Sequence, residues 1–158
     1  MLLYRIAQSK QRTTDLSGRG AYTFGGRWNN PGTYLLYTSE NSSLAYLESL
    51  VHFDPDIIPP RLYILGIEVS GSPDLIYTVP DAGYPKDWMK LGNLENKRLG
   101  DKWMREAKYV GIRVRSAVNP KEFNCLLNPL FPHYPSLVKV VSVERLPVDN
   151  RLIHIKMN

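Results

Sequence analysis

This 158-residue sequence has a single cysteine and lacks long apolar runs and long runs of one charge. Its one cysteine, Cys125, excludes a disulfide within the chain and is consistent with a reducing cytoplasm. No run of about 18 apolar residues is present, so we expect no membrane span. The N-terminal MLLYRIAQSK has too short an apolar stretch for a signal peptide. The sequence therefore predicts a cytoplasmic protein in which Cys125 is a small buried filler.

The charge is positive but spread along the chain. The formal net charge of +5 and the pI near 9.3 suit an anionic ligand, an acidic partner protein or nucleic acid, without choosing among them. The densest segment, residues 97–108, has Glu95, Asp101 and Glu106 beside or among its cations. This pattern is typical of a solvated helix face rather than of a nucleic-acid-binding stripe.

Composition and patterning favour one α+β domain over residues 1–158. Hydrophobic residues make up 43% of the chain and charged residues 22%, as in ordinary globular proteins. Twelve prolines favour short strands joined by irregular loops. Apolar, β-branched or alternating segments predict about seven strands, over residues 2–7, 33–38, 61–70, 110–115, 125–127, 137–146 and 151–156. Helices are expected over residues 42–53, with Asn41 as the N-cap, and over residues 94–109, although Gly100 weakens the second.

Glycines gather in the segment from Gly18 to Gly32, but not in a known nucleotide-binding pattern. A dinucleotide fingerprint needs a strand before its glycines and a helix after them, whereas here a polar segment precedes and a turn follows. The Gly-Lys-Ser/Thr of a Walker loop is absent. We therefore predict a flexible loop that delivers Arg27 and Trp28, since arginine suits a phosphate or carboxylate. A surface arginine on a glycine-rich turn is the alternative.

Glu48 is the carboxylate of interest on the first predicted helix. Helical spacing predicts an apolar stripe of Leu44, Leu47 and Val51, with Glu48 on its shoulder. A carboxylate there is either turned to the solvent or held in a partly dry pocket. In a pocket it would be a candidate for stabilising positive charge or accepting a proton.

The remaining polar candidates carry weaker signals. Ser116 ends an alternating strand, where a serine usually caps a turn, and no G-x-S-x-G elbow supports a hydrolase triad. The three histidines, His52, His133 and His154, share no metal-ligand spacing. We read each histidine as a surface or core residue and expect no metal site.

Several of these segments, in this order, resemble the RES-domain family. The motifs that carry the resemblance are Gly25-Gly26-Arg27-Trp28-Asn29, Tyr37-Thr38-Ser39, Ala45-Tyr46-Leu47-Glu48, Arg115-Ser116 and Asn124-Cys125-Leu126-Leu127-Asn128-Pro129. The family consists of bacterial toxins encoded beside an antitoxin with an Xre-like DNA-binding region. The resemblance implies a compact ADP-ribosyltransferase-like α+β fold with a mainly antiparallel split sheet and a few helices.

The resemblance also implies an activity and a site. Family members consume NAD as a substrate, with no prosthetic group, by hydrolysis, phosphorolysis or transfer of ADP-ribose to a protein. The family arginine, glutamate and serine correspond to Arg27, Glu48 and Ser116. In this interpretation Arg27 clamps a phosphate or ribose, Glu48 stabilises the oxocarbenium charge, and Ser116 bonds the ribose, the nicotinamide amide or Glu48 itself. The NAD-binding set also includes Tyr37, Trp28, Asn124 and Asn128, with Tyr37 stacking on nicotinamide.

The expected function is that of a growth-arresting toxin that cleaves the nicotinamide–ribose bond. Its expected partner is an Xre-like antitoxin that presents an acidic segment to the basic site, so nucleic acid would be reached only through the antitoxin. The sequence leaves a homodimer open. Two alternatives are a mono-ADP-ribosyltransferase that modifies a cellular protein and a basic nucleic-acid-binding module without catalysis.

Overall fold

The structure is a computed structural model, and it describes residues 1–53 and 61–152. The strands within these ranges are β1 (Leu2–Ala7), β2 (Leu36–Ser39), β3 (Leu62–Val69), β4 (Ile76–Thr78), β5 (Gly111–Arg115), β6 (Phe123–Leu127) and β7 (Val138–Leu146). The α-helices are α1 (Arg19–Phe24), α2 (Ser42–Leu50), α3 (Leu94–Glu106) and α4 (Tyr134–Leu137). Short 3₁₀ turns occupy Lys10–Thr14, Pro73–Leu75, Asp81–Gly83 and Asn150–Leu152. No helix in the described ranges is long and apolar enough to cross a membrane.

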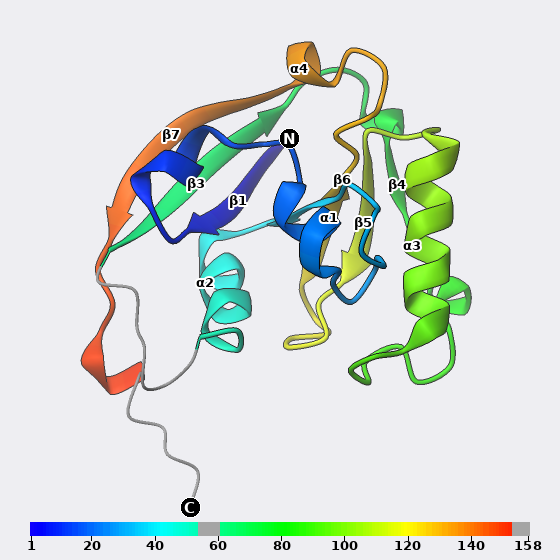
Figure 1. Cartoon of the computed structure of the whole chain (residues 1–158), viewed down its shortest axis with the longest axis horizontal. Coiled ribbons are helices and arrows are strands. Elements are labelled where there is room, and N and C mark those ends of the chain that lie inside the picture. The colour runs from blue at the N-terminus through cyan, green and yellow to red at the C-terminus, as the bar shows by residue number, and fades with distance from the viewer. Residues whose placement is uncertain (54–60, 153–158) are drawn as a thin grey trace, which may run out of the picture.

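The described strands form one sheet in the order β4-β5-β6-β2-β1-β3-β7, antiparallel except between β4 and β5. The sheet is nearly divided in two, because β1 and β2 share a single residue pair, Tyr4 with Ser39. Figure 1 shows β1, β3 and β7 on one side of this junction and β4, β5 and β6 on the other, with α3 beside the second half and α2 near the junction. The predicted α+β fold with a mainly antiparallel split sheet is confirmed.

The core lies on both faces of the sheet, as period-two strands require. In β6, Cys125 and Leu127 face one cluster, which includes Tyr134 of α4, and Leu126 faces the other, which includes Met104 of α3. Cys125 is fully buried and is the small filler that the sequence predicts. The exposed residues of α3 carry the predicted solvated charges, with ion pairs from Arg98 to Glu95 and from Lys102 to Glu106.

Several expected boundaries differ from the structure. Strand β2 begins at Leu36 rather than at residue 33, because Thr33 is still in the turn, with its N–H donating to Asn30 O, and Tyr34 stacks on Tyr22. The sequence pattern did not predict β4 and α4, which are only three and four residues long. It also missed α1, which two glycines in left-handed φ, Gly18 and Gly25, begin and end.

The helices are shorter than expected. Helix α2 ends at Leu50 instead of residue 53, and α3 ends at Glu106 instead of residue 109, because Ala107 takes the left-handed conformation that closes a helix. The predicted stripe on α2 is wrong, since Leu47 is 37% exposed and Val51 57%. The strand expected over residues 151–156 is also wrong at its start, which lies in a 3₁₀ turn, and its residues 153–156 lie outside the described ranges.

Candidate functional site

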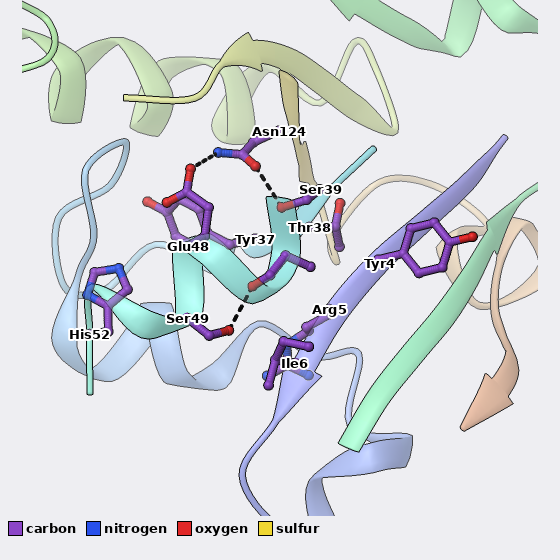
Figure 2. A pocket seen from close by; sticks show the side chains of 11 residues that line it. Tyr4, Arg5, Ile6, Tyr37, Thr38, Ser39, Glu48, Ser49, His52 and Asn124 are labelled. Atoms are coloured by element: carbon purple, nitrogen blue, oxygen red, sulfur yellow. Dashed lines mark hydrogen bonds between the residues drawn. The ribbon is translucent and has the colours of Figure 1, made fainter. Parts of the chain in front are cut away.

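A cleft opens where the two halves of the sheet meet. It consists of a larger hollow of about 710 Å³ and a smaller hollow of about 210 Å³. Both hollows are lined by Tyr37, Glu48, His52 and Asn124, so they adjoin along these side chains. Figure 2 shows Glu48 and Asn124 facing each other at this boundary, with Tyr37 behind Glu48.

Helix α2 places Glu48 in the cleft. Asn41 caps the helix, with its side chain accepting the N–H of Leu44 at 2.8 Å. The buried positions that anchor the helix are Leu44 and Ala45. Glu48 lies one turn after Leu44 and therefore points toward the sheet, half-buried. The helical pattern leaves the solvent and the pocket open for Glu48, and in the structure Glu48 lines the hollow, whereas Leu47 and Val51, predicted beside it, are exposed.

Two neutral donors hold one oxygen of Glu48. Ser116 Oγ and Asn124 Nδ2 each donate to Oε1 at 2.6 Å. Within the described part of the chain, Oε2 has no hydrogen-bond partner. The carboxylate is therefore anchored through one oxygen and presents the other to the cleft.

Ser116 is fully buried at the end of β5. Its oxygen accepts the N–H groups of Val118 and Asn119 at 3.1 and 3.0 Å, and its one proton goes to Glu48. A hydroxyl has one donor and two acceptor sites, so these three bonds use all of them. In this geometry Ser116 orients Glu48 and has no hydrogen-bonding capacity left for a ribose or an amide.

Tyr37 on β2 lines the cleft and hydrogen-bonds the loop that precedes β2. Its hydroxyl accepts the N–H of Trp28 at 2.9 Å and donates to Asn29 Oδ1 at 2.8 Å. Gly26 is required beside it, because a Cβ at this position would collide with the Tyr37 ring and hydroxyl. Burial raises the pKa of Tyr37 above its ordinary value, so the hydroxyl remains a donor.

Arg27 lies at the rim of the larger hollow. Its Nη1 donates to the carbonyl oxygens of Trp88, Met89 and Lys90 at 3.3, 2.7 and 3.2 Å. All three bonds use Nη1, and among the described residues no hydrogen bond uses Nε or Nη2. This edge of the guanidinium has the geometry for bidentate binding of an anion.

The buried side chain of Trp28 anchors the loop in the core. Its side chain is 2% exposed and packs against Trp88, Trp103 and Tyr84, with ring centroids 5.6–6.2 Å apart. Trp28 thus borders the larger hollow mainly as part of the core. The aromatic cluster fixes the loop that carries Arg27.

The charged side chains that line the cleft are cationic apart from Glu48. Lys97 of α3 and Arg115 of β5 line the larger hollow together with Arg27. Arg115 is partly neutralised by Asp81, 2.9 Å away. Arg5 borders the smaller hollow, where burial lowers the pKa of its guanidinium and Asp15 partly opposes that effect. Among the described lining residues Glu48 is the one carboxylate, so the cleft favours an anionic ligand that develops positive charge next to Glu48.

The structure brings most of the predicted site residues together. Arg27, Tyr37, Glu48 and Asn124 line the cleft, and Ser116 contacts Glu48. Asn128 lies elsewhere: it is fully buried, donates to Met104 O at 2.9 Å and accepts the N–H of Leu130. The role for Asn128 in NAD binding therefore has no geometric support, and its bonds join β6 to α3.

Several residues that contribute to the cleft carry no functional signal in the sequence, among them Ser39, Lys97 and His52. Ser39 bonds Asn124, Lys97 is the half-buried exception on the solvated face of α3, and the exposed His52 borders both hollows. No periodicity or spacing distinguishes these residues in the sequence. In the described ranges no group of three or more His, Cys, Asp or Glu side chains could hold a metal ion.

Comparison with known proteins identifies the family and the fold of the chain. The "Toxin Res" of Photorhabdus laumondii is 31% identical over 157 residues, covering 99% of each chain, and the "Prs ADP-ribosylating toxin" of a Sphingobium species is 31% identical over 157 residues, covering 95% of each. The crystal structure of the M. tuberculosis MbcT-MbcA toxin-antitoxin complex contains a chain of the same fold, with a TM-score of 0.71, 19% identity, and coverage of 92% of this chain and 83% of that one. The family model of the RES domain matches residues 2–149. The chain therefore belongs to the RES-domain family.

Proposed function

We propose that this protein is the toxin of a toxin–antitoxin pair and that it cleaves the nicotinamide–ribose bond of NAD. The observation that carries the proposal is the carboxylate of Glu48, anchored through Oε1 with Oε2 open to a cation-lined cleft. Support comes from the relatives named as toxins and as an ADP-ribosylating toxin. NAD combines an anionic pyrophosphate with a cationic nicotinamide ring, which matches both charges of the cleft.

Each part of the cleft has a role in this reaction. The open edge of Arg27, with Lys97 and Arg115, binds the pyrophosphate. The Tyr37 ring offers an aromatic face to the nicotinamide cation. As the bond between ribose C1′ and the nicotinamide nitrogen breaks, its electron pair leaves with neutral nicotinamide, and positive charge develops on the ribose. Glu48 Oε2 stabilises that charge, directly or through a ribose hydroxyl.

An acceptor completes the reaction by attacking C1′ and releasing a proton. Water gives ADP-ribose, inorganic phosphate gives its 1″-phosphate, and a nucleophilic side chain of another protein gives an ADP-ribosylated protein. The third outcome is a second candidate function, favoured by the name of the Sphingobium relative. All three share the same bond cleavage and the same role for Glu48.

The proposed partner is an antitoxin that covers the cleft. Large apolar residues are exposed near its rim, including Leu91 at 88% and Val51 at 57%, both of which line the larger hollow. An antitoxin segment with apolar and acidic residues would match this rim and the cations inside it. An Xre-like DNA-binding region in that partner is part of the proposal.

The test is incubation of the purified, partner-free protein with NAD, with the products identified by proton NMR. We expect release of nicotinamide together with ADP-ribose, or with its 1″-phosphate when phosphate is present. Labelled NAD with cell extract tests transfer to protein, which would appear as a labelled band. Intact NAD under all three conditions would refute the proposal, and a salt-sensitive affinity for nucleic acid would then favour the binding-module alternative.

A further inference from the structure

Ser39 is a buried serine that has no assigned role in the proposed reaction. It is the last residue of β2, it is 4% exposed, and its hydroxyl donates to Asn124 Oδ1 at 2.7 Å. We propose that Ser39 is a positioning residue for catalysis, acting through Asn124 to hold Glu48. This inference rests on the proposed cleavage of NAD at Glu48.

The direction of each hydrogen bond follows from the chemistry of the groups. An ionised carboxylate only accepts, so Asn124 must turn its NH₂ group toward Glu48. The carbonyl oxygen of Asn124 then faces Ser39, and the hydroxyl of Ser39 must be the donor. Figure 2 shows this chain, in which both bonds point their protons toward Glu48.

Ser39 adds a second bond that holds the amide in this orientation. A flipped Asn124 would place its carbonyl oxygen against Glu48 Oε1, where two acceptors repel each other, so the carboxylate selects the orientation and the hydroxyl of Ser39 stabilises it. Without Ser39, only the bond to Glu48 would orient the amide.

The location of Ser39 in the sheet makes this arrangement rigid. Ser39 is paired with Asn124 across β2 and β6, and with Tyr4 across β2 and β1. Side chains of directly opposed residues in neighbouring strands lie close together on the same face, so the Ser39–Asn124 bond is set by the register of the sheet. The orientation of Glu48 is thereby tied to both halves of the sheet.

No charged side chain takes over this role in the described residues, because both donors to Glu48 are neutral. The charged and titratable groups that line the two hollows beside Glu48 are Tyr4, Arg5, Arg27, Tyr37, His52, Lys97 and Arg115. None of them hydrogen-bonds Glu48 in the described structure. The orientation of the carboxylate therefore depends on Ser116 and on the Ser39–Asn124 pair.

The test compares Ser39→Ala with Thr38→Val. Thr38 is a matched control, because it is a buried neighbour on the same strand, and its hydroxyl donates at 2.7 Å to Cys125 O and takes no part in the bonds that hold Glu48. We expect Ser39→Ala to lower kcat about tenfold, the size of one lost hydrogen bond, while KM for NAD stays within about twofold. Thr38→Val should change thermal stability to a similar extent but leave kcat unchanged.

A second readout does not depend on turnover. In the free protein the side-chain amide protons of Asn124 should exchange slowly with solvent, as seen by NMR, and in Ser39→Ala they should exchange faster. If the wild-type protein leaves NAD intact, the proposed function fails, and this measurement still decides whether Ser39 holds the amide. An unchanged kcat in Ser39→Ala, an equal loss in Thr38→Val, or unchanged amide exchange would each overturn the inference.

Discussion

Replacing Gly100 with alanine sets two opposing effects against each other. Gly100 lies on the buried stripe of α3, between Asn96 and Met104. A Cβ there would overlap the carbonyl oxygen of Trp28 and lie 2.7 Å from its carbonyl carbon, where ordinary contacts begin at 3.4 Å. The obstructing atoms are backbone, so no side-chain rotation relieves the overlap. Helix and loop would have to separate.

The separation outweighs the gain in helix propensity. Alanine favours a helix over glycine by about 1 kcal/mol, whereas overpacking costs roughly 1–3 kcal/mol or more. The same separation strains the bonds from Asn30 to Asp101, at 2.7 and 3.0 Å, and bonds to charged groups contribute about 1.5–3 kcal/mol each. We expect a net loss of about 2–3 kcal/mol, which lowers Tm by roughly 5–10 °C for a domain of this size.

Gly20→Ala is the matched control, because Gly20 is exposed in α1 and a Cβ there would meet nothing within 4 Å. This substitution should raise stability by about 0.5–1 kcal/mol. Calorimetry and urea unfolding measure both variants. NAD turnover should fall in Gly100→Ala alone, since the displaced segment carries Arg27. Equal or greater stability of Gly100→Ala than of the wild type would refute the close approach of α3 to Trp28.

Three further predictions address the site and the core. Glu48→Gln should lower kcat by about 10²–10³-fold with little change in fold. The control Glu68→Gln, at an exposed position of β3, should not change turnover. If Glu48→Gln turned over NAD as fast as the wild type, Glu48 would have no part in the reaction. Because burial raises the pKa of Tyr37, stability should fall as the pH rises above about 10, and Tyr37→Phe should make this fall shallower in a series of unfolding curves. Burial also raises the pKa of Cys125 to about 12, so alkylation at pH 8, followed by mass spectrometry, should occur only in denaturant, and labelling of the folded protein would contradict its burial.

The fold class was predictable because it depends on local patterns. Alternation and β-branched residues mark β1, β3, β5 and β7, and the cap at Asn41 marks the start of α2. The sequence could not indicate that α2 would turn Leu47 and Val51 outward. That choice depends on the junction between β1 and β2, which brings together segments more than thirty residues apart in the chain.

The sequence predicted several of the residues that line the cleft, but not how they contact one another. The resemblance to a family supplied Arg27, Glu48 and Ser116, whereas periodicity alone left each of them with an ordinary structural explanation. Ser39 could not be found in this way, because its role depends on the amide of Asn124, a cross-strand neighbour on β6. Asn128 belongs to the same sequence motif as Asn124, but it lies four residues later, just after the end of β6. There its side chain bonds Met104 of α3 instead of lining the cleft.

The single pair between Tyr4 and Ser39 makes the sheet mechanically uneven. Every other pair of adjacent strands shares at least three residue pairs, from three between β4 and β5 to eight between β3 and β7. Separating β1 from β2 therefore breaks fewer backbone pairs than separating any other two adjacent strands of the described sheet. Among the described strands, the pair that shares the fewest residue pairs thus lies beside Glu48, at the edge of the cleft where the two halves of the sheet meet.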